Sequence, residues 1–263
     1  MALANFETYV RGRSRLHTWT PRLKLASLGL LMFAFAAVRH LALVPPMLCL
    51  TAGFYLLSEL PFSFLLKRLS YPGLFILMVV LVLPFSTGET VLWQWDALAL
   101  RQEGIETMLL ILGRFLSILT LGFILLGTTP FVTLLRGLRS LGLPHLIADM
   151  TLLTYRYLFE TAEMLSTMQR SMRLRGFGQQ QRWFRLQRQD LQRLAGLLGT
   201  LLVRSYERSE RVYKAMQLRG YGQQKRSVEK PSIDSSSVLL TGFSIIAALS
   251  FVIAEFSLPA VSL

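Results

Sequence analysis

The sequence predicts an all-α polytopic membrane protein, with about five transmembrane helices and a three-helix domain on the cytoplasmic side. The first observation is the apolar content: 52% of the 263 residues are apolar and 16% are charged, whereas an average soluble domain has about 25% charged residues. The second is the placement of charge. Residues 130–232 hold 18 Lys/Arg against 7 Asp/Glu, and so carry most of the net charge of +13. A lipid-embedded part and a basic part are therefore expected.

This composition excludes two classes of protein. The apolar content is too high for a disordered chain, and a single cysteine, Cys49, cannot make a disulfide framework. Residues 1–24 are basic and precede an apolar run, as the start of a secretory signal does. Because further long apolar runs follow, we interpret residues 1–24 as a cytoplasmic segment before a first membrane span.

Four spans are expected within a membrane domain of residues 25–128, and a fifth follows near the C-terminus. A span needs about 20 mostly apolar residues, or fewer where it is buried in protein. Arg39 and His40 end the first apolar run, and Lys67 and Arg68 form a short polar loop before the third. The expected spans are Leu25–Val38, Leu41–Ser58, Tyr71–Thr87, Ile105–Thr128 and Val238–Phe256.

Basic residues decide the expected orientation. Cytoplasmic loops are enriched in Lys and Arg, so residues 1–24, the loop at Lys67 and Arg68, and the basic domain belong on one side of the membrane. Five spans satisfy this condition with the N-terminus inside and the C-terminus outside. The loop of residues 88–104, whose charges are mainly acidic, then faces outward.

The basic domain, residues 129–224, is too charged to lie in lipid and too apolar to be unstructured. Its apolar residues recur every three or four positions, which predicts amphipathic helices. The expected helices are Phe131–Leu141, a long one between Pro144 and Gly176, and a second long one from about Arg182 to Gly220. Residues 225–237 are polar, contain Pro231, and are expected to form a linker to the last span.

An internal repeat is the most specific feature of the basic domain. Residues 170–180 are RSMRLRGFGQQ and residues 214–224 are KAMQLRGYGQQ, at an offset of 44 positions. Seven of the eleven positions are identical, and three more are similar in type. The basic domain therefore carries the same short motif twice.

Each copy ends a predicted helix with an arginine and a glycine, Arg175-Gly176 and Arg219-Gly220. Glycine closes a helix by adopting a positive φ, and a cation in the last turn complements the helix dipole. Ordinary helix capping explains one copy alone. Two copies at matched positions favour a second interpretation, in which each projecting arginine enters an acidic pocket of a partner. The planar guanidinium suits that role because it can bind a carboxylate through two hydrogen bonds.

Several stretches of the sequence resemble a known family. They are Ser14–Leu25 (SRLHTWTPRLKL), Gly127–Glu160 (GTTPFVTLLRGLRSLGLPHLIADMTLLTYRYLFE) and the two Ala-x-x-x-Arg-Gly signatures that end at Gly176 and Gly220. The sequence is similar to the transmembrane T component of energy-coupling factor (ECF) transporters, in particular to the CbiQ-like members associated with cobalt and nickel uptake. The first signature has Ser171 where the family has Ala. The resemblance covers essentially the whole chain.

The resemblance implies a force-transmitting subunit of a prokaryotic plasma-membrane importer, without enzymatic activity of its own. Two ATP-binding cassette ATPases would dock on the basic domain, which is then a coupling domain. A separate substrate-binding S component in the bilayer would carry the solute. The solute itself, whether cobalt, nickel or a vitamin, is not determined by this chain. The implied ATPase-docking residues are Ser171, Arg175, Gly176, Ala215, Arg219 and Gly220.

No cofactor, metal or nucleotide site is expected in this chain. The sequence has no G-x-x-x-x-G-K-[ST] motif, and His17, His40 and His145 stand apart from any Cys or carboxylate cluster. Within the fourth span, Arg114 is costly in lipid. We expect it either to contact another helix or subunit, or to snorkel or pair internally.

A second class of function stays open from the residues alone. A basic cytoplasmic domain on five spans could dock on RNA or a ribosome, as membrane insertases do. Aromatic residues such as Tyr155 and Trp183 are interleaved with its basic ones, which permits that function. Nucleic acid favours a diffuse basic face, whereas two isolated helix-ending arginines favour paired protein pockets. We therefore expect protein partners and no nucleic acid.

Overall fold

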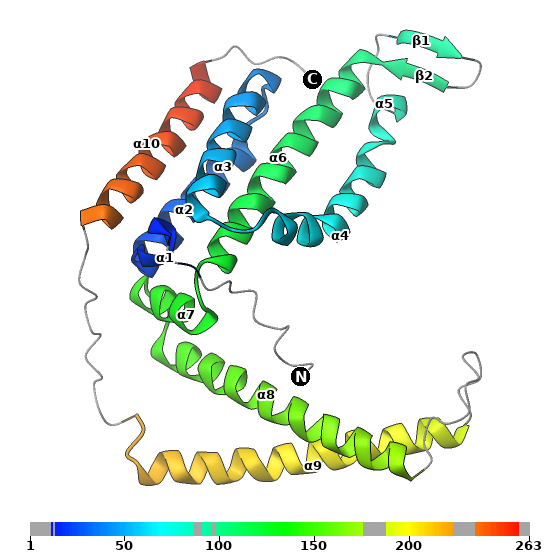
Figure 1. The fold of residues 1–263 in the computed structure, drawn as a ribbon, viewed down its shortest axis with the longest axis vertical. Helices are drawn as coiled ribbons and strands as arrows, with labels where there is room; N and C mark the ends of the chain where they lie inside the picture. The colour runs from blue at the N-terminus through cyan, green and yellow to red at the C-terminus, as the bar shows by residue number, and fades with distance from the viewer. Residues whose placement is uncertain are drawn as a thin grey trace. The chain divides into compact units, whose positions relative to one another are not determined.

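The computed structural model describes residue 12 and residues 14–86, 91–95, 98–175, 188–222 and 235–257. These residues form two compact units. We call residues 6–143 with 231–263 the membrane unit, and residues 144–230 with 1–5 the two-helix unit. Each unit is described by itself below (Figure 1).

The fold is all-α, as predicted, apart from one short hairpin. In chain order the elements are α1 Arg15–Thr18, α2 Pro21–Ala37, a 3-10 turn η2 Leu41–Leu43, α3 Val44–Ser58, α4 Phe62–Val80, α5 Leu83–Ser86, β1 Val91–Trp95, β2 Leu98–Arg101, α6 Gln102–Gly127, α7 Phe131–Ser140, α8 His145–Leu174, α9 Arg188–Leu218 and α10 Ser235–Ser257. Within the described residues, four segments are long and apolar enough to cross a membrane: Leu41–Ser58, Phe62–Val80, Gln102–Gly127 and Ser235–Ser257. The first predicted span corresponds to α2, which has 17 residues.

The polar loop predicted at Lys67 and Arg68 is wrong. Both residues lie inside α4, which begins at Phe62 and not at Tyr71. Lys and Arg have good helix propensity, and long basic side chains can lie along apolar surface. The Arg68 guanidinium accordingly lies 5.0 Å from the centroid of the Phe64 ring.

The third predicted span also ends too late, because α4 stops at Val80. A proline has no N–H to continue the helix, and its ring would collide with the carbonyl four residues earlier. Pro84 therefore disfavours a continuation of α4, whose last residue is four positions before it, although the helix does pass through Pro72. The short helix α5 follows instead.

A hairpin occupies part of the predicted loop of residues 88–104. β1 and β2 are antiparallel, with Trp95 opposite Leu98 and an irregularity in register near Val91. The strands are rich in Val, Leu and Trp, of which Val and Trp favour extended structure. α6 begins directly after the hairpin, at Gln102.

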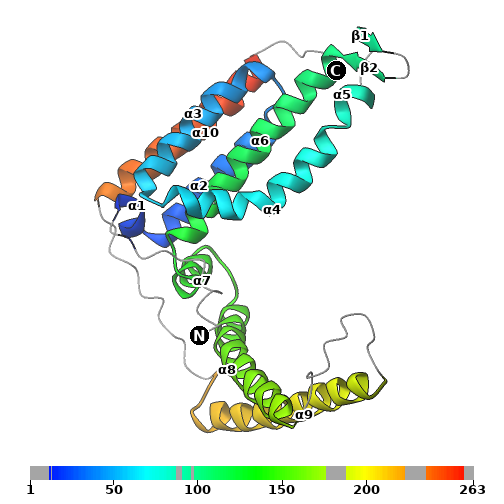
Figure 2. The same ribbon diagram turned by 45° about the vertical axis from the view of Figure 1, so that its right-hand side comes forward.

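The core of the membrane unit lies around α2, which packs on α6, α7 and α10. Leu28 and Phe35 of α2 are fully buried, and the Phe35 ring meets Phe251 of α10 edge-on at 5.1 Å. Ala247 and Ala248 of α10 are also buried, and such small residues let membrane helices approach closely. The last helix of the chain therefore lies beside one of the first (Figures 1 and 2).

α7 packs within the membrane unit, although the sequence grouped it with the two long helices of the basic domain. Leu135 is buried, and Gly137 touches α2 so closely that a Cβ there would lie 3.2 Å from the Pro21 carbonyl carbon and 3.0 Å from Leu25 Cδ1. Because α2 covers this side of α7, the division between the units falls after it, between Leu143 and Pro144.

Candidate functional site

The two-helix unit consists of α8 and α9, which run antiparallel where they touch. The Tyr221 hydroxyl, just after α9, donates a hydrogen bond to Asp149 Oδ2 near the start of α8 at 2.9 Å. Farther along, Arg208 Nη1 forms an ion pair with Glu160 Oε2 at 2.7 Å. The same guanidinium lies 5.5 Å from the centre of the Tyr157 ring. These polar contacts fix the register of the two helices.

The two repeated motifs lie at the C-terminal ends of α8 and α9, which point away from each other (Figures 1 and 2). Starting from the ion pair between Glu160 and Arg208, α8 continues for about 22 Å to Arg175, and α9 for about 16 Å to Arg219, at 1.5 Å per residue. Since the helices run in opposite directions, these lengths set an upper bound of about 39 Å on the separation of the two arginines, and the two helix ends lie at opposite ends of the pair (Figures 1 and 2). One small pocket cannot hold both.

The second motif closes α9 through a glycine C-cap. Gly220 has φ of 67°, its N–H donates to the Gln217 carbonyl at 2.9 Å, and the Tyr221 N–H donates to the Met216 carbonyl at 3.0 Å. This pair of hydrogen bonds defines the Schellman motif, which requires positive φ at the glycine position. The cap leaves Arg219 directly after the last helical residue, Leu218, with an exposed side chain.

The first motif ends α8 in the same way as far as the structure describes it. Arg175 follows the last helical residue, Leu174, and its N–H donates to the Ser171 carbonyl at 3.2 Å. The Ser171 hydroxyl donates to the Thr167 carbonyl at 2.8 Å, so it is satisfied within its own helix. Gly176 lies outside the described residues.

Both motif arginines are available to a partner. Their side chains are exposed, and within the residues that the structure describes neither guanidinium has an ion-pair or hydrogen-bond partner. Ser171 and Ala215 lie one turn before the arginines, are also exposed, and therefore share their helical face. Each helix end thus presents a small residue followed by a projecting cation.

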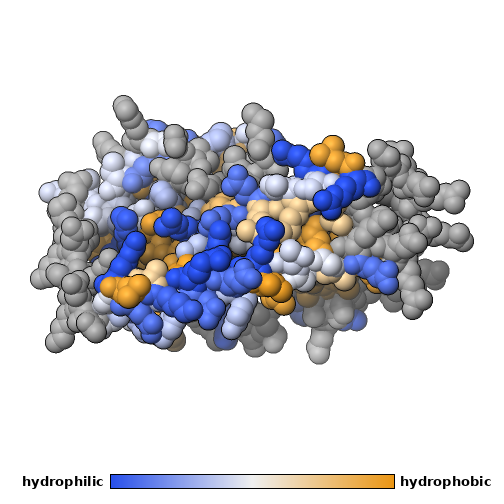
Figure 3. Space-filling model, turned by 90° about the horizontal axis from the view of Figure 1, so that it is seen from below, coloured by the Kyte–Doolittle hydropathy of each residue, from blue (hydrophilic) through white to orange (hydrophobic). Residues whose placement is uncertain are grey.

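The apolar side chains of α8 and α9 are largely uncovered within their unit. Among the described side chains, only Ala148 of α8 and Leu197 of α9 are buried. Leu194, Leu198 and Leu202 recur every four residues along α9 and are exposed, the last by 72%. Hydrophobic patches interrupt the hydrophilic surface on the face seen from below (Figure 3). Exposed apolar stripes of this extent are typical of surfaces that partners cover.

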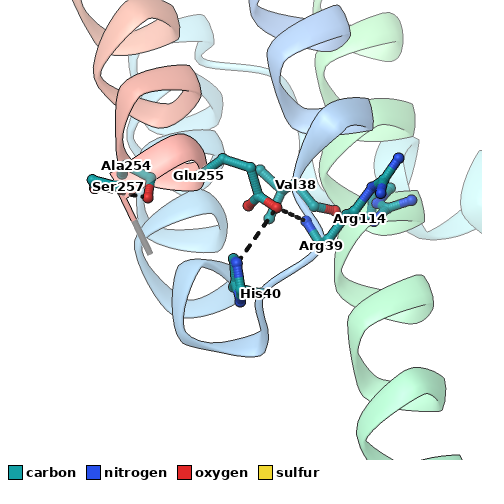
Figure 4. Close-up of polar contacts among 7 residues, drawn as sticks. All are labelled: Val38, Arg39, His40, Arg114, Ala254, Glu255 and Ser257. Carbon is teal, nitrogen blue, oxygen red and sulfur yellow. Dashed lines mark hydrogen bonds and ion pairs between the residues drawn. The ribbon is translucent and has the colours of Figure 1, made fainter. Parts of the chain in front are cut away.

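A separate polar cluster lies in the membrane unit, where the end of α2 meets α6 and α10 (Figure 4). Arg114 of α6 donates to the carbonyl of Val38. Glu255 of α10 accepts a hydrogen bond from the Arg39 N–H at 3.0 Å and lies 3.8 Å from His40 Nε2. Three helices and the turn after α2 are therefore joined by charged groups.

Family comparison decides what kind of protein carries this architecture. The family model of CbiQ, described as cobalt transport protein, matches residues 12–230, which include both motif arginines. The chain belongs to the CbiQ family.

Curated relatives of this CbiQ family member are similar over part of their length. The energy-coupling factor transporter transmembrane protein EcfT of Limosilactobacillus fermentum is 30% identical over 185 residues, 65% of this chain and 67% of the relative. The EcfT of Brevibacillus brevis is 32% identical over 163 residues, 57% of this chain and 60% of that relative. The EcfT of Ruminiclostridium cellulolyticum is 30% identical over 159 residues. The matches to the latter two span about three fifths of those relatives.

Three residues of structural importance were not singled out from the sequence of this CbiQ family member. Glu255 was visible as the single carboxylate of the last span, and a lone acid and a lone base in different spans favour a pair. Lys24 was interpreted only as part of the basic flank of the first span, although it is buried. Nothing in the sequence pattern distinguished Arg208 from the other arginines of α9.

Proposed function

We propose that this CbiQ family member is the transmembrane coupling subunit of an ECF-type importer. Its two-helix unit binds two ATP-binding cassette ATPases and passes their movement to a substrate-binding S component in the membrane. The solute is a transition-metal ion, such as cobalt or nickel, or a vitamin. The chain itself does no covalent chemistry, and ATP hydrolysis belongs to the partner ATPases.

The observation that carries this proposal is the pair of exposed, helix-ending arginines at opposite ends of one rigid helix pair. Arg175 and Arg219 are each fixed by the end of a helix, and they lie too far apart for one pocket. A guanidinium held in this way suits an acidic groove, because it can bind a carboxylate through two hydrogen bonds. Two similar motifs suit two similar ATPases.

The exposed apolar stripe at Leu194, Leu198 and Leu202 supports the second part of the proposal. An apolar surface on a helix that holds few buried residues needs a covering partner. An S component, which is itself a membrane protein, offers apolar surface of this kind. The methionines of α8, including Met150 and Met164, suit a contact that slides, because methionine adapts to changing surfaces.

Orientation follows from the charge asymmetry, and we propose a cytoplasmic N-terminus and an external C-terminus. In a Cys49-free variant, a single cysteine at Arg182 should resist a membrane-impermeant thiol reagent applied to intact cells. A single cysteine at Glu103, next to the hairpin, should react with it. Labelling of position 182 from outside would overturn this topology.

Co-purification tests the proposed function against its alternative. The intact chain is extracted from its own membranes in mild detergent. Two nucleotide-hydrolysing subunits should co-purify with it. RNA or ribosomal proteins in place of ATPases would show that the basic unit docks on a nucleic-acid machine. The helix-capped arrangement of Arg175 and Arg219 favours the ATPases over that alternative, because nucleic acid selects a diffuse basic face.

A further inference from the structure

A buried lysine joins three segments of the membrane unit. Lys24, in the second turn of α2, is 1% exposed. Its Nζ donates to the Leu16 carbonyl of α1 at 2.8 Å, to the Thr129 hydroxyl at 2.9 Å and to the Thr128 hydroxyl. An ammonium group has three N–H donors, so each donor has one acceptor. Lys24 therefore links α1 and α2 to the corner between α6 and α7.

The acceptors of Lys24 are themselves held in place. Thr128 and Thr129 are both buried, and the Thr128 hydroxyl donates to the Ile124 carbonyl at the end of α6. The Thr128 N–H also bonds to Ile124. Movement of this corner away from α2 would therefore take two of its three acceptors from the buried Lys24 amine and would remove the Lys24 donor from the buried Thr129 hydroxyl, which is costly.

α7 touches α2 at a second point as well. Near the other end of α7, Gly137 packs closely against Pro21 and Leu25, so that a Cβ there would lie 3.0 Å from Leu25 Cδ1 and 3.2 Å from the Pro21 carbonyl carbon. α7 ends at Ser140, Gly142 follows with φ of 119°, and the Leu143 N–H donates to the Leu138 carbonyl at 3.2 Å. The helix is thus fixed to α2 before its first turn, by Lys24, and again near its last, by Gly137.

The position of α7 in the chain gives this attachment its importance. α7 is the last element of the membrane unit, and α8 begins at His145, only two residues after the division between the units. A displacement of α8 is therefore transmitted along the chain to α7 first. If α7 were not attached to α2, this displacement would move α7 alone. Because α7 is attached, the displacement also moves α2.

We propose that Lys24 is a positioning residue for energy coupling: it holds the corner between α6 and α7 on α2, so that movement of the coupling helices is transmitted to the membrane helices. This inference rests on the proposed function. An apolar residue would fill the same space with a smaller desolvation cost. A lysine adds directional hydrogen bonds to three separate segments, which an apolar side chain cannot supply.

The test uses the whole complex of membrane chain, ATPases and S component, reconstituted in liposomes, with uptake and ATP hydrolysis measured together. Lys24→Met keeps an unbranched side chain, one heavy atom shorter, and removes its donors. The variant complex should retain its ATPases and continue to hydrolyse ATP, while the solute taken up per ATP falls about tenfold or more, because the corner loses its hold on α2. Arg22→Met, which removes an exposed cation two residues earlier on α2, should change neither quantity.

A second variant separates coupling from folding. Thr128→Val with Thr129→Val keeps the lysine but removes two of its acceptors, and should lower uptake per ATP in the same direction. Adding Lys24→Met to it should cause little further loss, because all three changes remove one connected set of contacts. This variant decides the matter if Lys24→Met does not assemble.

The two failures are distinguishable. Absence of ATP-driven uptake by the wild-type complex would contradict the proposed function. Wild-type uptake per ATP in both the Lys24 and the threonine variants, or a fall of uptake and hydrolysis in equal proportion, would overturn the positioning role of Lys24 and leave the proposed function standing.

Discussion

Replacing Arg175 and Arg219 together with Glu is expected to release the ATPases from the membrane chain. A hydrogen bond to a charged group contributes about 1.5–3 kcal/mol, and each substitution also places a carboxylate opposite an acidic groove. Loss at two sites amounts to about 3 kcal/mol or more, which is about a hundredfold or greater loss of affinity. The measurement is the amount of ATPase retained on the purified chain. Neither arginine lies in a span, so insertion into the membrane should be unaffected.

A charge-matched variant serves as the control. Arg173→Glu with Lys214→Glu makes the same change of net charge on the same two helices. Arg173 lies two residues before Arg175 and thus on another helical face. Among the described residues, Lys214 makes one exposed ion pair, with Glu210 at 3.6 Å, which contributes little to stability. The control should keep its ATPases. Equal loss from both variants would mean that bulk charge, and no specific pocket, holds the complex together.

Glu255→Gln is expected to loosen the attachment of α10 to the rest of the membrane unit. The glutamine keeps the shape of the side chain but removes the negative charge beside His40. The hydrogen bond from the Arg39 N–H also becomes a neutral one. Because a hydrogen bond to a charged group contributes about 1 kcal/mol more than a neutral one, the expected loss of stability is about 1 kcal/mol. It should appear as a thermal unfolding midpoint several degrees lower for the solubilised chain.

Ser257→Ala is the matched control for Glu255→Gln. Ser257 is exposed two residues later on α10, and its hydroxyl bonds only to the Ala254 carbonyl of its own helix among the described residues. It should leave the unfolding midpoint unchanged. A Glu255→Gln chain that unfolds at the wild-type temperature would mean that the charged cluster in Figure 4 adds nothing to the stability of the unit.

The sequence predicted the helical elements best where a long apolar run or an amphipathic period defined them. α6 and α10 begin and end within three residues of the predicted fourth and fifth spans. The start of α4 was missed, because Lys67 and Arg68 suggested a loop, whereas their side chains suit a helix as well as a loop.

The contacts between elements were less accessible from sequence. The repeat at Arg175 and Arg219 was visible because seven of eleven positions are identical, and the glycine cap at Gly220 followed from known helix chemistry. Lys24, by contrast, bonds to threonines 104 and 105 positions away. No local period or motif carries that information, and a lysine before an apolar run equally suits the cytoplasmic flank of a span.

The same limit explains why α7 was grouped with the long helices. Its charges, Arg136 and Arg139, suit the basic domain. Its packing, however, depends on the close approach of Gly137 to α2, which is set by tertiary structure. Composition described the solvent-facing side of α7 and could not indicate which helix would cover the other side.

Site-specific cross-linking tests the central claim most directly. A photo-reactive amino acid at Ser171 or Ala215, each one turn before a motif arginine on the same face, would be activated in intact membranes. Each position should give a covalent product with an ATPase subunit. Probes at Arg173 and Gln217, two residues before the arginines and on other faces, should give little of it. Cross-links from Ser171 and Ala215 to RNA-binding or ribosomal proteins, or equal yields from all four positions, would contradict the docking of ATPases at the two helix ends.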